Sequence, residues 1–151
     1  MNQHLSEQEL IRREKLADLQ KLGIDPFPAP LYPVNATTTH IKENFKGEEN
    51  KAEFAEVCLA GRIMSVRDMG KASFAVLQDS VGKIQIYIKR DEICPGEDKI
   101  MYDQVWKKLL DMGDIIGVKG YVFTSFQFVV LLFMAFSGLF AWRKKARYAR
   151  D

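Results

Sequence analysis

Hydrophobic and polar positions follow the short period of β-strands along four stretches in the middle of the chain. These stretches are Glu56–Arg67, Ser73–Asp79, Lys83–Lys89 and Asp114–Phe123, and all are rich in Val, Ile or Phe. Between the third and the fourth, apolar residues of Ile100–Leu110 recur at helical spacing. Three strands, a helix and a strand form the order of an OB-fold, a small barrel that binds oligonucleotides. The predicted fold class is mainly β, an OB-fold whose fifth strand is absent or replaced.

The N-terminal region carries the signals of one helix followed by a stiff connector. Ser6 and Glu9 have the spacing of a capping box, and Gly23 supplies a stop. Four of the five prolines follow within residues 26–33, where they exclude a helix or a central strand. The predicted organisation is a helical extension at 1–24, a Pro-rich connector at 25–55, an OB-fold domain at 56–124, an apolar segment at 125–142, which could be a C-terminal helix, and a basic tail at 143–151.

The third predicted strand has two unlike faces. Ile84, Ile86 and Ile88 share one face, which must be the core side. Gln85, Tyr87 and Lys89 therefore share the opposite face. An amide and an aromatic ring on the open face of an OB hairpin suit single-stranded nucleic acid. The ring can stack on an unpaired base for roughly 1–3 kcal/mol, and the amide can hydrogen-bond a base edge.

The second predicted strand adds a further aromatic residue to this face. If Leu77 faces the core, Phe74 points outward beside Gln85. Arg67 and Lys71 precede this strand and could contact phosphates or bases. The alternative is that the Pro-rich connector covers Phe74 and that Arg67 is only a solvated charge. The predicted RNA-binding residues are Phe74, Gln85, Arg67, Lys71 and Tyr87.

Several motifs resemble the class II lysyl-tRNA synthetases. They are Arg-Arg-Glu-Lys-Leu at 12–16, Gly-Ile-Asp-Pro-Phe-Pro at 23–28, Ala-Gly-Arg-Ile-Met at 60–64, Met-Gly-Lys-Ala-Ser-Phe at 69–74, Leu-Gln-Asp at 77–79 and Gly-Asp-Ile-Ile-Gly at 113–117. The resemblance implies an anticodon-binding OB domain in which Phe74 stacks on the central anticodon uridine while Gln85 and Arg67 contact it. Secondary tRNA contacts are expected at Arg12, Arg13 and Lys15.

The resemblance also sets expectations for what this chain does not do. ATP, magnesium and lysine would belong to a catalytic domain that is missing here, so the chain is not expected to aminoacylate tRNA alone. No catalytic residue is predicted, and Cys58 and Cys94 are too isolated for a metal site. The resemblance also implies a possible homodimer, as whole enzymes of this family form. The family's anticodon-reading glutamate, in a Thr-Gly-Glu-Ile/Leu-Ser segment, is absent after Thr124.

The composition changes abruptly near Thr124. Residues 1–124 carry 17 Lys and Arg against 19 Asp and Glu, a net −2, whereas residues 125–151 carry five against one, a net +4. The whole-chain charge of +2 therefore describes neither part. Gly120–Trp142 has no charged residue, and a basic cluster follows at 143–147.

Three interpretations of this tail stay open. Phe126–Trp142 is a candidate transmembrane helix, since about 20 apolar residues span a bilayer. A slip of the reading frame would instead replace strand 5, and a neighbouring frame would then encode a Gly-Glu-Ile-Ser sequence. Alternatively, Phe126–Leu132 pairs as a makeshift fifth strand. The functions that follow are tRNA anticodon binding by a cytoplasmic fragment of a lysine–tRNA ligase, a membrane-tethered OB module anchored through residues 126–142, or a non-functional truncated product.

Overall fold

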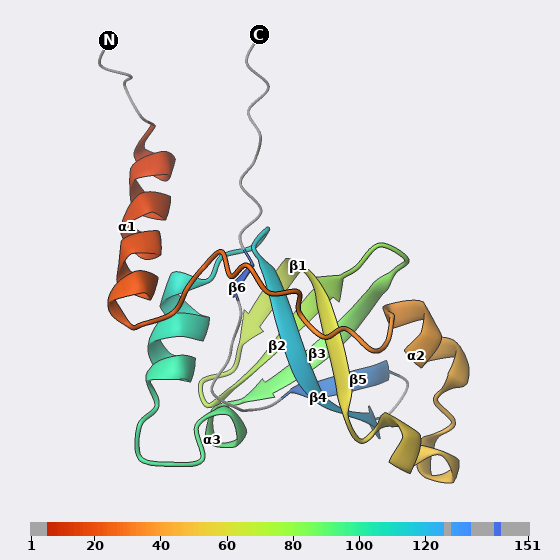
Figure 1. Ribbon diagram of the computed structural model, residues 1–151. Coiled ribbons are helices and arrows are strands. Elements are labelled where there is room, and N and C mark those ends of the chain that lie inside the picture. The colour runs from red at the N-terminus through yellow and green to blue at the C-terminus, as the bar shows by residue number, and fades with distance from the viewer. Residues whose placement is uncertain (1–5, 126–127, 134–140, 143–151) are drawn as a thin grey trace, which may run out of the picture.

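The computed structural model describes residues 6–125, 128–133 and 141–142, and a curled β-sheet forms its centre (Figure 1). The strands are β1 (Val57–Asp68), β2 (Ala72–Gln78), β3 (Lys83–Lys89), β4 (Ile115–Ser125), β5 (Phe128–Phe133) and β6 (Ala141–Trp142). The helical segments are α1 (Glu7–Lys21), α2 (Thr38–Asn44), η1 (Gly47–Glu49), η2 (Lys51–Phe54), α3 (Arg90–Ile93) and η3 (Met101–Leu109). Figure 1 places α1 beside η3 at one end of the sheet and α2 at the other.

The sheet closes into the barrel that the strand order predicted. Its order is β1-β2-β3-β5-β4, and β1 pairs with β4 to complete the ring. The pair β3–β5 is parallel, and the other pairs within this ring are antiparallel. The helical segment predicted over Ile100–Leu110 is η3, a π-helix, at whose end the Leu110 amide donates to the carbonyl of Val105 at 3.0 Å. The OB-fold prediction is therefore confirmed.

The described part of the apolar tail forms strands. The prediction of a helix over Phe126–Trp142 is therefore wrong for these residues. Residues 128–133 are β5, which pairs with β3 and with β4, while 141–142 form the short β6. Residues 126–127, 134–140 and 143–151 lie outside the described residues. Within the part of the chain that the structure describes, no helix is long and apolar enough to cross a bilayer. The makeshift strand is found, beginning two residues later than predicted, whereas the slip of the reading frame stays a prediction.

The N-terminal helix begins and ends where its signals lie. The Ser6 amide donates to Glu9 Oε2 at 2.8 Å, and the Glu9 amide donates to Ser6 Oγ at 3.3 Å, which completes the capping box. Gly23 follows the helix with a φ of 77°, a left-handed conformation that glycine adopts without a Cβ clash. Leu19 is fully buried and anchors α1 to the core.

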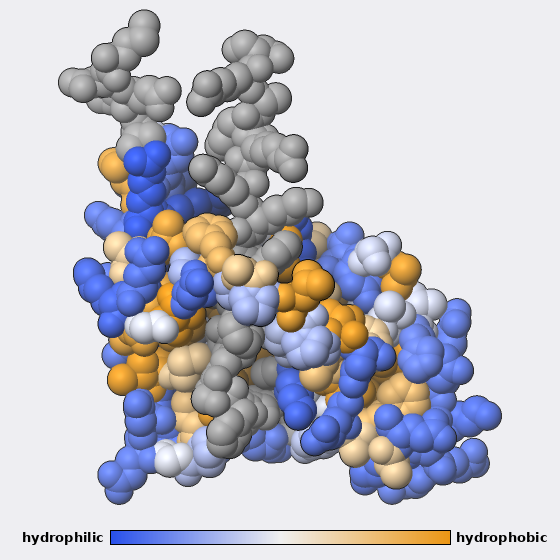
Figure 2. Space-filling view, viewed as in Figure 1, coloured by the Kyte–Doolittle hydropathy of each residue, from blue (hydrophilic) through white to orange (hydrophobic). Residues whose placement is uncertain are grey.

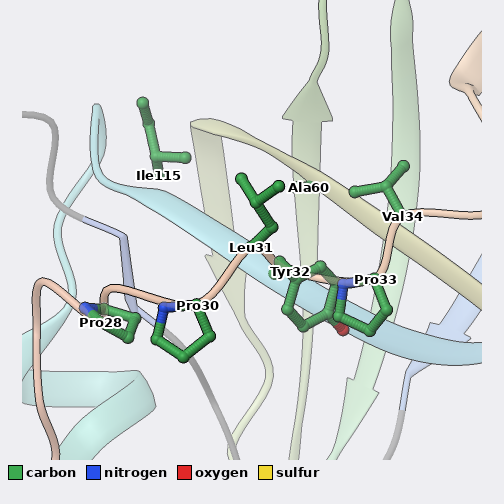
Figure 3. Close-up of a pocket in the computed structure, with 9 residues that line it drawn as sticks. Pro28, Pro30, Leu31, Tyr32, Pro33, Val34, Ala60 and Ile115 are labelled. Atoms are coloured by element: carbon green, nitrogen blue, oxygen red, sulfur yellow. The ribbon is translucent and has the colours of Figure 1, made fainter.

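The Pro-rich connector lies over β1 and β4, and not over Phe74 of β2. Asn35 extends the β1 ladder, because its amide donates to the Cys58 carbonyl at 3.1 Å and its Oδ1 accepts from the Cys58 amide at 2.8 Å. The ring of Tyr32 packs directly on Gly117, where an added Cβ would lie only 2.6 Å from the ring. Figure 3 shows connector side chains lining an apolar pocket of about 320 Å³ beside Ala60 of β1. The connector exposes several large hydrophobic side chains, namely Phe27, Leu31 and Val34. Figure 2 shows hydrophobic residues over the middle of this face, with hydrophilic residues on either side.

The turn between β2 and β3 is held by one carboxylate. Asp79 accepts hydrogen bonds from the amides of Val81 and Gly82 at 2.9 Å each. It also accepts from the Thr38 amide at 2.7 Å and the Thr38 hydroxyl at 2.8 Å, at the start of α2. Burial by itself would raise the pKa of Asp79, but these hydrogen bonds together hold it below its ordinary value. The hairpin that carries Phe74 is thereby tied to α2.

Candidate nucleic-acid interface

Three predicted site residues lie in one row across three strands. In the register of the sheet, Arg67 of β1 is opposite Phe74 of β2, and Phe74 is opposite Tyr87 of β3. Their neighbours Ala75 and Ile86 are buried in the core, so the row lies on the outer face of the barrel. The outward orientation that the period-2 pattern predicted for Phe74 is therefore found.

The Phe74 ring is held by a parallel ring beneath it. Its centroid lies 4.6 Å from that of Tyr87, and the two ring planes are inclined by 19°, an offset-stacked arrangement. The ring thus has a rigid support on one side. A base that stacked on the other side would extend this pair into a stack of three rings.

A hollow of about 230 Å³ adjoins the Phe74 ring. It is lined by Ser65, Val66, Arg67, Phe74, Ala75, Val76 and Gln85. Gln85 is opposite Val76 in the β2–β3 ladder, one step along the sheet from the aromatic row. The hollow therefore brings together an aromatic wall, a primary amide that both donates and accepts, and a guanidinium group. These are the groups that an unpaired base with its phosphate would require.

Lys71 lies on the β1–β2 loop and does not line the hollow, and a long-range ion pair holds this loop in place. Lys107 of η3 pairs with Asp68 at 2.9 Å and also donates to the Gly70 carbonyl at 3.2 Å. The hydrogen bond from Lys107 is the main cause that lowers the pKa of the Asp68 carboxyl. The Lys71 side chain is exposed. Arg67, by contrast, lies within β1 itself and not in the loop.

The three basic residues predicted as secondary contacts are away from the hollow and do not act alike. Lys15 of α1 pairs with Asp111, in the loop before β4, at 2.5 Å, and both side chains are partly buried. This contact fixes α1 against the barrel. Arg12 and Arg13 are exposed on the same helix. Contact of these three residues with tRNA stays a prediction.

Sequence reasoning missed further residues on the outer face. Tyr121 and Phe123 alternate along β4 with the buried Val122, and the Phe123 ring makes an edge contact with Tyr87 at 6.4 Å. Lys89, which the period-2 pattern did place on this face, lies over the Tyr87 ring, with its Nζ 5.5 Å from the centroid. The period-2 argument used for β3 would have found the two β4 aromatics, because β4 alternates in the same way.

The fold and this face define a class of protein: a small barrel with an aromatic, amide-bearing and cationic outer surface. Residues 57–130 match the sequence model of the OB-fold nucleic acid binding domain.

The more particular relatives are lysine–tRNA ligases. The enzyme of Porphyromonas gingivalis is 63% identical over 121 residues, which are 80% of this chain and 21% of the relative. That of Christiangramia forsetii is 59% identical over 123 residues, 82% of this chain and 21% of the relative. That of Moorella thermoacetica is 46% identical over 115 residues, 76% and 21% respectively. The predicted resemblance is confirmed, and the chain spans about a fifth of the length of these relatives.

Proposed function

We propose that this chain binds the anticodon of lysine tRNA on the outer face of its barrel, as the corresponding part of a lysine–tRNA ligase. The observation that carries the proposal is the Phe74 ring, stacked on Tyr87 and bordering the hollow that Arg67 and Gln85 also line. The family of the domain and the names of the relatives support an RNA ligand over a DNA ligand. Catalysis, with ATP, magnesium and lysine, is left to parts of the enzyme outside this chain.

The chemistry of the hollow fits a uridine. A uracil ring offers two carbonyl acceptors and one N–H donor on its pairing edge. The Gln85 amide can donate to one carbonyl and accept from the N–H, while the Phe74 ring stacks on the flat face. Arg67 would neutralise a phosphate or donate to a further acceptor. Because the family's anticodon-reading glutamate is absent, we expect discrimination among bases to rest on Gln85.

Binding of a fluorescent anticodon stem-loop RNA of lysine tRNA, followed by anisotropy, tests the proposal. Phe74→Ala should weaken binding by about 1–3 kcal/mol, the value of one stacked base. Phe27→Ala removes a ring of the connector that is 48% exposed and away from the hollow, so its affinity should equal that of the unsubstituted chain. Unchanged binding by the Phe74 variant, with its fold verified by circular dichroism, would refute the stacking role. The homodimer implied by the resemblance stays a prediction for sedimentation to test.

A further inference from the structure

Four aromatic side chains form a continuous strip across the outer face of the barrel. We call Phe74, Tyr87, Phe123 and Tyr121 the aromatic strip. Successive ring centroids are separated by 4.6 Å from Phe74 to Tyr87, 6.4 Å from Tyr87 to Phe123 and 6.1 Å from Phe123 to Tyr121. The strip takes its rings from β2, β3 and β4, and the contact between Tyr87 and Phe123 spans β5, which lies between β3 and β4 in the sheet. It therefore extends well beyond the hollow in which a single base is proposed to bind.

The members of the aromatic strip differ in how much ring surface they offer. Tyr87 is half-buried, and its ring is occupied by three neighbours: Phe74 stacks on it, Phe123 contacts it edge-on and the Lys89 ammonium lies over it. Tyr121 ends the strip on β4 and is 39% exposed, a high value for an aromatic residue within a strand. The ring planes of Tyr121 and Phe123 are inclined by 48°, so Phe123 does not stack on the face of the Tyr121 ring. Tyr121 is therefore the exposed end of the strip, and Phe74, at the other end, borders the hollow.

A cation lies over the middle of the aromatic strip. Lys89 is held by Glu92 at 3.0 Å, and the hydrogen bond to Glu92 is the first cause that raises the pKa of Lys89, so the ammonium stays charged. The Lys89 Nζ lies 5.5 Å from the centroid of Tyr87, the ring between Phe74 and the β4 aromatics. An ammonium has three N–H donors, and Glu92 uses one, so donors remain for a phosphate. A cation between two open rings matches a sugar–phosphate link between two stacked bases.

We propose that Tyr121 is a second base-stacking residue, which holds a nucleotide neighbouring the one held at Phe74, with Lys89 contacting the phosphate between them. The inference rests on the proposed function, since it assumes that Phe74 receives a base of the same RNA strand. On this inference, the aromatic strip binds a short unpaired RNA segment of at least two nucleotides and not a single base. Tyr87 and Phe123 are positioning residues, because they support the rings at the two ends.

Anisotropy titrations with the anticodon stem-loop RNA test the assignment when each loop nucleotide is replaced in turn by an abasic one. Tyr121→Ala should weaken binding to the intact loop by about five-fold or more, the loss expected for one stacked base. This penalty should vanish for the RNA that lacks one particular base. The penalty of Phe74→Ala should vanish for a different abasic position. Tyr121→Phe should bind as the unsubstituted chain does, since stacking needs the ring and not the hydroxyl.

Two further variants separate loss of stacking from loss of structure. Tyr121→Leu keeps an apolar side chain in β4 and should weaken binding as the alanine variant does, with an unchanged thermal midpoint. Phe27→Ala should again have no effect. Full affinity in both Tyr121→Ala and Tyr121→Leu would overturn the second site. The second site would also be overturned if one and the same abasic position abolished the binding loss caused by Tyr121→Ala and that caused by Phe74→Ala. An unaffected Phe74→Ala variant would instead refute the proposed function, so the two failures are distinguishable.

Discussion

Removal of the Asp79 carboxylate should destabilise the barrel by an amount that its hydrogen bonds set. In Asp79→Ala, the Thr38 amide and hydroxyl lose acceptors at 2.7 and 2.8 Å. Thr38 is 0% exposed, so water cannot replace them, and each buried unsatisfied donor costs about 1–3 kcal/mol. The exposed Val81 amide can turn to solvent at little cost. Because the Thr38 hydroxyl can rotate toward another acceptor, we expect a total loss of about 2–4 kcal/mol.

Urea unfolding followed by far-ultraviolet circular dichroism measures this loss. Glu97→Ala is the matched control, since it removes an exposed carboxylate from a loop and should change the free energy of unfolding by less than about 0.5 kcal/mol. A loss of less than about 0.5 kcal/mol in Asp79→Ala would refute the reasoning. RNA binding by the folded fraction should persist, because Phe74 and Gln85 are paired within β2 and β3.

The same carboxylate predicts a dependence on pH whose sign follows from its lowered pKa. The folded-state pKa of Asp79 lies below the unfolded value of about 3.9. Its contribution to stability is therefore complete above the unfolded pKa and is lost as the pH falls through the folded pKa. Asp79→Asn should remove this component, so the stability difference between the variant and the unsubstituted chain should shrink as the pH is lowered from 6 toward 3. A difference that grows over this range would contradict the assignment.

Two further predictions concern close packing inside the barrel, and urea unfolding tests both. Gly61→Ala would place a Cβ 2.5 Å from the Gln78 carbonyl oxygen and should lower the free energy of unfolding by about 1–3 kcal/mol. Gly96→Ala is the control, because its Cβ would have nothing within 4 Å, and it should cost little. Equal losses of stability in the two variants would contradict this prediction. Tyr102→Phe should cost about 1–2 kcal/mol, because it leaves the buried Ser73 hydroxyl without its 2.8 Å partner. Adding Ser73→Ala to that variant should restore part of the stability, and a further loss would argue against an unsatisfied hydroxyl.

The features that the sequence predicted well are those that neighbouring residues specify. The capping box of Ser6 and Glu9 spans three positions, and the alternation that buries Ile84, Ile86 and Ile88 has a period of two. Such patterns need no knowledge of the rest of the fold. For the same reason, the outward orientation of Phe74 and Gln85 could be inferred from period alone.

The fifth strand shows where local patterns stop being informative. Residues 128–133 are a continuous apolar run, and periodicity cannot distinguish a buried strand from a helix in such a run. The open edges of β3 and β4 supply the backbone partners that make this run β5. Any hydrophobic strand that hydrogen-bonds to both of these edges would complete the ring of strands.

By itself, then, the sequence determined the strands, the N-terminal helix and the face on which Phe74 and Gln85 lie, because each depends on spacing along the chain. The tertiary structure alone decided which groups meet across long separations. It stacks Tyr87 beneath Phe74, links Tyr87 through Phe123 to Tyr121, and pairs Lys15 with Asp111, 96 positions away. Contacts of this kind form only when the barrel closes, since closure brings distant strands within the reach of a side chain.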